Sequence, residues 1–185
     1  MTLSARVSIA SNALAWLALA LAWFDLLPAM PFPFLVHKAL HLVGVVVFGG
    51  NLFSGPVWLA FAWASGDPKL LAFAARSLAR ADVWLTTPGV QLALWNGLFA
   101  AQAFGPLRQQ PWLVETLALM AVVSLLSCTL VLYWQERLVV ACEQGDRAAI
   151  RRSLLWWSLW GTALSVPFAW VFWLMLGKRA LLVGV

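Results

Sequence analysis

Long apolar segments follow one another along almost the whole chain, and short polar breaks separate them. Each segment has the roughly 20 or more residues that a helix needs to cross the hydrocarbon core of a bilayer. The breaks combine proline or glycine with polar residues, a pattern that ends helices. The pattern predicts an all-α polytopic membrane bundle of five transmembrane helices, at about residues 7–27, 34–66, 81–104, 112–143 and 147–176. The first helix and its proline-rich connector form residues 1–33, and the other four helices form a core, residues 34–185.

The second apolar segment, from Phe34 to Gly66, is longer than crossing requires and contains both histidines of the chain, His37 and His41. At 1.5 Å per residue, a helix of about 30 residues is about 45 Å long, against a hydrocarbon core of about 30 Å. We therefore expect this helix to tilt or to protrude into water, with a kink at Gly55-Pro56. An ionisable side chain inside such a segment is a candidate functional residue.

The third transmembrane helix is preceded by a short amphipathic segment. Asp67-Pro68 predicts the start of that segment, with the acid as N-cap and the proline in the first turn, and Gly66 suits the end of the preceding helix. Thr87-Pro88-Gly89 predicts a kink further along. Asp82 closely follows Arg80, so we expect its carboxylate to form an ion pair with a nearby arginine.

The composition agrees with a membrane protein. Hydrophobic residues make up 63% of the chain and charged residues only 10%, against about 45–50% and about 25% in soluble domains. The thirteen tryptophans suit the membrane interface. The net charge of +5 comes from basic residues spread over several loops, so nucleic acid is not an expected partner. We expect a multi-pass protein of the bacterial cytoplasmic (inner) membrane, with the lipid bilayer as its surroundings.

The basic residues predict the orientation of the bundle. If the N-terminus is cytoplasmic, eight of the twelve basic residues lie on the cytoplasmic side, as the positive-inside rule requires. The cytoplasmic set is Arg6, Lys69, Arg76, Arg80, Arg137, Arg147, Arg151 and Arg152; the external set is Lys38, Arg108, Lys178 and Arg179. This N-in, C-out topology places His37 and His41 near the external end of their helix.

A weak internal repeat relates the two halves of the core. Each copy has a Gly-Asp turn followed, after the same interval, by a proline inside a helix. The copies are Gly66-Asp67 with Pro88, and Gly145-Asp146 with Pro167. The repeat predicts two helical hairpins related by an axis along the membrane normal, and it makes Met120 the counterpart of His41.

His37 and His41 lie four residues apart and therefore share one helical face. Three interpretations stay open. They are interfacial polar residues bonded to a loop or to lipid headgroups, or axial ligands of a b-type haem, or the first two ligands of a copper or zinc site. Two histidines one turn apart on one helix cannot bind opposite faces of a single haem. A second ligand must then come from another helix or from a partner subunit, and Met120 is a candidate because His/Met ligation is sound haem chemistry.

Other residues at membrane depth have a structural interpretation. Amide side chains there commonly form hydrogen bonds between helices, and the four candidates are Asn51, Gln91, Asn96 and Gln102. Gly44, Gly49 and Gly50 give their helix a thin surface, which permits the close approach of another helix or of a flat cofactor.

From Leu40 onward the chain resembles a bacterial integral-membrane family of unknown function, the domain of unknown function twenty-two sixty-nine. The resemblance rests on the order and spacing of short stretches that run through the second to fifth helices. They are Leu40-His41-Leu42-Val43-Gly44 with Gly50-Asn51; Ser65-Gly66-Asp67-Pro68; Ala81-Asp82 with Thr87-Pro88-Gly89; and Leu174-Met175 followed by Lys178.

The histidine- and glycine-containing helix is also distantly similar to two other families. These are the J-type membrane protoporphyrinogen oxidase, which is linked to haem, and the copper-resistance D-type membrane protein. In the oxidase a histidine on the equivalent helix and a lysine on another helix are thought to be functional. The resemblance carries over the histidine, as His41; Lys69 lies in a turn and does not match the lysine.

These observations favour a haem-associated redox or electron-transfer protein, such as a subunit of a respiratory complex, with His41 as an axial ligand. One alternative is a non-catalytic membrane scaffold or accessory subunit that binds other membrane subunits or a second copy of itself. Another is transport of metal ions or small solutes, although few polar residues lie near the expected midplane, where a transport path requires them.

Overall fold

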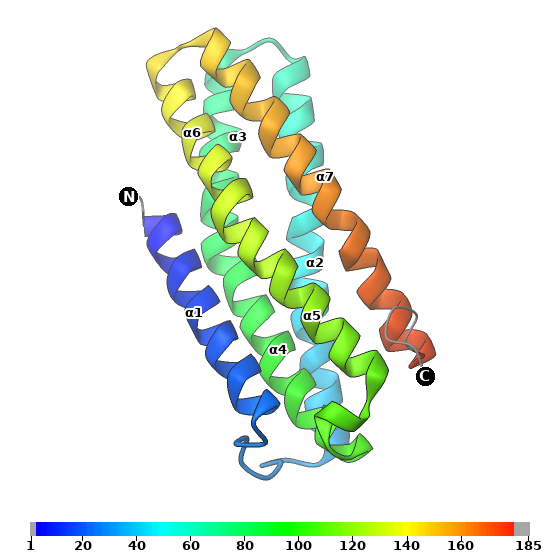
Figure 1. Cartoon of the computed structure of the whole chain (residues 1–185). Coiled ribbons are helices and arrows are strands. Elements are labelled where there is room, and N and C mark those ends of the chain that lie inside the picture. Colours follow the sequence, from blue (N-terminus) through cyan, green and yellow to red (C-terminus); the bar gives the residue numbers. More distant parts are fainter. Residues whose placement is uncertain (1–2, 180–185) are drawn as a thin grey trace.

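In the computed structural model, which describes residues 3–179, the chain is a bundle of long helices, and no strand occurs in that range (Figure 1). Its α-helices are α1 (Leu3–Trp23), α2 (Phe34–Ala64), α3 (Pro68–Ala81), α4 (Thr87–Ala101), α5 (Pro111–Leu126), α6 (Leu132–Gln144) and α7 (Arg147–Gly177). Two π-helical turns, η1 (Asp82–Thr86) and η4 (Ser127–Val131), join α3 to α4 and α5 to α6, and two short 3₁₀ turns, η2 (Gln102–Phe104) and η3 (Leu107–Gln109), lie between α4 and α5. The prediction of an all-helical polytopic membrane protein is confirmed.

Four helical segments of the described chain are long and apolar enough to cross a membrane. They are Leu3–Trp23, Phe34–Ala64, Pro111–Gln144 and Arg147–Gly177. The segment α3 to α4 is not among them. Its first part, α3, carries the exposed basic residues Lys69, Arg76 and Arg80, whereas α4 packs against α2 and α1. The N-in, C-out orientation stays a prediction.

The π-helical turn η1 replaces the kink predicted at Thr87-Pro88-Gly89. The Thr87 N–H donates to the carbonyl of Asp82, five residues back, and Pro88 follows directly. Pro88 has no N–H, and its ring clashes with the preceding turn of a regular α-helix. The wider π-helical turn avoids that clash. The helices α2 and α7 continue through Pro56 and Pro167. Of the two prolines in the predicted repeat, Pro88 and Pro167, only Pro88 therefore follows a π-helical turn.

The two Gly-Asp turns have the same local structure, as the repeat predicts. Gly66 and Gly145 both have a φ of +69°, a conformation that glycine adopts at little cost. The Asp67 carboxylate accepts the Lys69 N–H at 2.8 Å, and the Asp146 carboxylate accepts two N–H groups at the start of α7, both at 3.0 Å. Both acids are N-caps.

We expect Asp67→Ala and Asp146→Ala each to lower the free energy of unfolding by about 1 kcal/mol, because each leaves N–H groups of a first helical turn without a side-chain acceptor. Thermal unfolding in detergent measures the loss. The matched control is Asn at each position, which keeps an oxygen acceptor and should preserve most of the stability. Equal losses for Ala and Asn would contradict a capping role.

Helix α1 packs against α4 and α5, through a stripe of small residues. The buried members of the stripe are Ser4, Ala5, Ser11, Ala15, Ala18 and Ala22. Hydrogen bonds secure it: Ser4 Oγ donates to Glu136 Oε1 at 2.9 Å, and Gln91 Nε2 donates to the carbonyl and hydroxyl oxygens of Ser11, both at 2.8 Å. The helix predicted as an edge element is therefore bonded to both α4 and α6.

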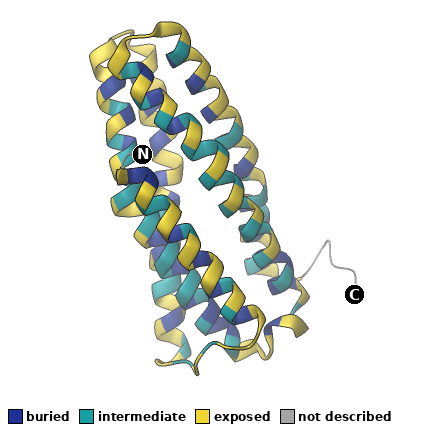
Figure 2. Ribbon diagram, turned by 60° about the vertical axis from the view of Figure 1, so that its left-hand side comes forward, coloured by how far each residue is buried: buried dark blue, intermediate teal, exposed yellow. Residues whose placement is uncertain are grey.

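Apolar packing forms two clusters at opposite ends of the bundle. The cluster near the Gly-Asp turns contains Leu59, Ala62, Leu71, Ala75, Leu78, Leu138, Ala141, Ile150 and Trp157. The cluster at the other end contains Ala18, Ala22, Leu98, Ala101, Leu107, Trp112 and Leu113. Many residues along the helices are exposed (Figure 2). They include many leucine, valine, phenylalanine and tryptophan residues, as a lipid-facing surface requires.

Candidate functional site

One face of α2, which we term the α2 seam, carries a row of polar contacts to neighbouring segments and the closest backbone approach to α4. Its residues are His37, His41, Gly44, Phe48, Asn51 and Gly55. They recur at alternating intervals of four and three, the spacing of helices that pack at a small crossing angle. Most of the seam faces α4 and η1, and Gly55 meets Leu78 of α3.

His37 is buried, with 2% of its surface exposed, and both of its ring nitrogens are bonded. The Phe32 N–H, in the proline-rich connector, donates to Nε2 at 3.3 Å, and Nδ1 lies 2.8 Å from Asn96 Oδ1. A backbone N–H can only donate, so Nε2 is unprotonated and Nδ1 carries the proton given to Asn96. The Phe99 ring packs 5.0 Å from the imidazole, centroid to centroid. His37 therefore joins the connector to α4, and neither nitrogen is left for a metal ion.

His41 is half-buried, and only one of its nitrogens is bonded within residues 3–179. Nδ1 lies 2.7 Å from the carbonyl oxygen of Ala93, which can only accept, so Nδ1 carries a proton and Nε2 is the nitrogen that the neutral imidazole leaves as an acceptor. Every buried side-chain nitrogen and oxygen in that part of the chain has a partner, so Nε2 lies at the surface of the bundle. Gly97 makes room for the ring, because a Cβ atom there would lie 2.7 Å from His41 Nδ1.

The other predicted ligand, Met120, lies on a helix that packs mainly elsewhere in the bundle. Met120 is half-buried on α5, which packs mainly on α7, whereas α2 packs mainly on α4. Among the described residues, no group of three or more His, Cys, Asp or Glu side chains is placed to hold a metal ion. The pairing of His41 with Met120 stays a prediction.

Of the three α2 glycines that were predicted to permit close approach, Gly44 alone lies against another helix. A Cβ at Gly44 would lie 2.4 Å from the backbone nitrogen of Ala93 and 2.7 Å from the carbonyl oxygen of Gly89. At Gly49 and Gly50, by contrast, a Cβ would meet nothing within 4 Å. The backbones of α2 and α4 therefore touch at Gly44, between His41 and Asn51 on the seam.

Further along the seam, Asn51 contacts Asp82 of η1. The Asp82 carboxylate accepts hydrogen bonds from neutral groups, and the predicted ion pair with an arginine is wrong. Asn51 Nδ2 and Thr86 Oγ1 each donate to Asp82 Oδ1 at 2.9 Å, and Gln135 Nε2 donates to Oδ2 at 2.6 Å. Arg76 and Arg80 are both exposed. We term Asp82, Asn51, Thr86 and Gln135 the Asp82 cluster.

Gln135 was not anticipated from the sequence. It is buried and also accepts the Trp157 N–H of α7, at 3.4 Å. In the sequence, Gln135 precedes Leu138 and Ala141 at intervals of three residues, a spacing that places all three on one helical face. That spacing could have predicted an inward-facing amide, and all three residues are buried. Three of the four predicted amides form the expected bonds between helical segments: Asn51 and Asn96 bond along the seam, and Gln91 reaches α1. Gln102 instead donates to the Pro28 carbonyl of the connector, at 2.9 Å.

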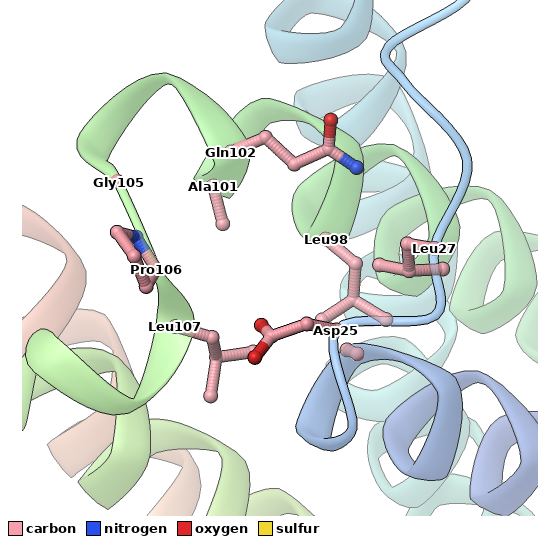
Figure 3. Close-up of a pocket in the computed structure, with 9 residues that line it drawn as sticks. Asp25, Leu27, Leu98, Ala101, Gln102, Gly105, Pro106 and Leu107 are labelled. Atoms are coloured by element: carbon pink, nitrogen blue, oxygen red, sulfur yellow. The ribbon is translucent and has the colours of Figure 1, made fainter.

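A cleft of about 360 Å³ lies at the end of the bundle where α1 and α4 end (Figure 3). Its polar side chains are Asp25, whose carboxylate points towards Leu107, and Gln102. Asp25 has a φ of +55° and is exposed. An exposed acid and an amide already bonded to the connector do not form a catalytic arrangement, so the α2 seam is the better candidate site.

A family model described as predicted integral membrane protein (DUF2269) matches residues 35–179. The match includes the whole α2 seam and the Asp82 cluster, and it begins after α1. No curated protein and no solved structure matches the chain.

Proposed function

We propose that this chain, which belongs to the DUF2269 family of predicted integral membrane proteins, is a membrane redox protein that binds a b-type haem through His41. One observation carries the proposal: the Nδ1–H of His41 is bonded to the Ala93 carbonyl, and Nε2 has no partner among the described residues and is not buried. A histidine that ligates a metal commonly gives its second N–H to a carbonyl or carboxylate, which fixes the tautomer and the orientation of the ring.

One of the two histidines is suited to bind the haem iron. His41 is that ligand, whereas both ring nitrogens of His37 already form hydrogen bonds. The second axial position would be filled by Met120, by a partner subunit, or by a second copy. When bound, the haem iron supplies one-electron transfer. The protein residues have separate tasks: Ala93 orients His41, Gly97 leaves space for its ring, and His37 holds the start of α2 against α4.

The segment of α2 that contains His41 also presents an apolar surface on its outward faces. Leu42, Val43 and Val46, which point away from the face that His41 shares with His37, are each more than half exposed. Such a surface accommodates lipid, a macrocycle or another membrane subunit. We place the protein in the cytoplasmic membrane of a bacterium with its N-terminus inside, which puts His41 nearer the external face.

An optical spectrum of the purified protein tests the proposal. We expect a Soret band from protein made in haem-sufficient cells, and we expect His41→Ala to abolish it. The matched control is His37→Gln, one turn away, which should keep the band if His41 is the ligand. Protein that yields no haem on extraction would contradict the proposal. If that protein also carries a stoichiometric partner, it is instead an accessory subunit.

Transport of metal ions or small solutes is a second candidate, and the Asp82 cluster favours it. Asn51 lies near the middle of α2 (Phe34–Ala64) and bonds to an acid from a neighbouring segment. Polar groups gathered at the middle of a bundle are what a transport path requires, and the sequence by itself did not show that these residues meet.

A further inference from the structure

We infer that Asp82 is a proton-binding site within the helix bundle, where its carboxylate takes up one proton to become the neutral acid and releases it again. The reaction is a simple protonation and needs no further reactant. The inference rests on the Asp82 cluster alone and does not depend on the proposed binding of haem.

The acid lies among buried side chains from several helices. Asp82 itself is half-buried, whereas its partners Asn51 and Gln135 have 8% and 5% of their surface exposed. Asn51 belongs to α2, Gln135 to α6, and Trp157, behind Gln135, to α7. A single carboxyl group therefore joins three neighbouring helices to its own segment. An ionisable residue at such a point of a membrane bundle is a functional candidate by default.

No cation balances the charge of the acid among the described residues. The groups that face it are the amides of Asn51 and Gln135 and the Thr86 hydroxyl, all neutral. The nearest charged residue along α6 is Glu136, which accepts a hydrogen bond from Ser4 of α1. The basic residues of α3 and α6 that come closest along the chain, Arg76, Arg80 and Arg137, are exposed.

The directions of the hydrogen bonds identify the atom that takes the proton. An indole N–H can only donate, so Trp157 turns the oxygen of Gln135 towards itself and the amide NH₂ towards Asp82 Oδ2. That oxygen therefore always faces a donor. On the other side, Asn51 Nδ2 donates both to Oδ1 and to the Thr86 hydroxyl oxygen. Unlike the amides, the Thr86 hydroxyl can change from donating to accepting. Oδ1 is the oxygen beside this reversible partner, so we assign the proton to Oδ1.

The backbone around the acid is irregular in the two segments that supply most of the cluster. Asp82 and Thr86 are the first and last residues of the π-helical turn η1, and Gln135 lies one turn after η4. π-Helical turns occur frequently at functional sites. The neutral donors allow Asp82 to hold a charge, and the lack of a cation makes that charge costly inside a membrane. Both protonation states are therefore accessible, which is the property of a site that exchanges protons.

Infrared difference spectroscopy of the protein in lipid nanodiscs, titrated between neutral and acidic pH, tests the inference. We expect the C=O band of a protonated carboxylic acid to grow as the pH falls. Asp82→Asn should remove the band, and Thr86→Val, which keeps the acid but removes a bond to Oδ1, should shift its frequency. The control is Glu115→Gln, which removes another buried carboxyl group and should leave the band in place.

The proposal would be overturned by a band that persists in Asp82→Asn, by a band lost in Glu115→Gln, or by no band at any pH at which the protein stays folded. The same titration of His41→Ala separates this result from the haem proposal. We expect the Asp82 band in that variant whether or not the wild-type protein contains haem.

Discussion

Replacing Gly44 by alanine is expected to destabilise the protein by about 3 kcal/mol or more, although the same substitution usually stabilises a helix. The added methyl group would lie 2.4 Å from the backbone nitrogen of Ala93, 2.7 Å from the carbonyl oxygen of Gly89 and 2.9 Å from the Ala93 Cα. These are backbone atoms, so no change of rotamer relieves the overlap, and α2 and α4 must separate. Overpacking of a rigid contact typically costs about 1–3 kcal/mol and sometimes more.

Gly50→Ala is the matched control, on the same helix and with the same added methyl group. A Cβ at Gly50 meets nothing within 4 Å, so alanine should raise stability by about 0.5–1 kcal/mol through its better helix propensity. Thermal unfolding in detergent compares the two variants. If Gly44→Ala proved as stable as Gly50→Ala, the contact between the two backbones would be disproved. Because Ala93 also bonds to His41, Gly44→Ala should weaken any ligand binding by His41.

His37→Ala is expected to lower the free energy of unfolding by about 2–4 kcal/mol. The substitution opens a cavity beside Phe99, and it leaves Asn96 Oδ1 without its imidazole donor and the Phe32 N–H without its acceptor. Loss of a large buried side chain and of partners for buried polar groups each cost a few kcal/mol.

His41→Ala provides the comparison for His37. It loses one hydrogen bond from a half-buried ring, so we expect a cost of only about 1 kcal/mol. The double variant His37→Ala with Asn96→Ala should cost less than the sum of the single variants, because the two side chains share one bond. Equal losses for the two histidines, measured by thermal unfolding, would contradict the separation of a structural His37 from an available His41.

The α2 seam contains two groups of polar contacts, separated by a close contact between backbones. At one end His37 and His41 bond to Asn96 and Ala93 of α4, and further along Asn51 joins the Asp82 cluster. Between them the α2 backbone touches α4 at Gly44. Direct backbone contact leaves no space for water between α2 and α4 at Gly44.

Helix positions could be read from the sequence because their causes are local. A membrane-spanning segment must satisfy its own backbone hydrogen bonds and present apolar side chains to lipid, so length and hydrophobicity identify α1, α2 and α7. The breaks at Gly66-Asp67 and Gly145-Asp146 were equally clear, since a glycine at positive φ and an acidic N-cap act within a few residues. The preference for His41 over His37 rested on its deeper position along the helix and on the resemblance to the oxidase family, and the hydrogen bonds add a physical reason.

By itself, the sequence determined that this is an all-helical membrane protein and located the polar breaks that separate its long helices. The first helix, predicted at residues 7–27, runs from Leu3 to Trp23, and the third, predicted at 81–104, is divided between α3, η1 and α4. Only the tertiary structure decided which polar atoms meet. Asp82 follows Arg80 closely in sequence, yet its carboxylate bonds to Asn51 and to the distant Gln135. The reason is geometric: the rotation of each helix about its axis, set by packing over its whole length, determines which side chains face one another. A buried carboxylate takes the partners that this packing brings to it, not those nearest along the chain.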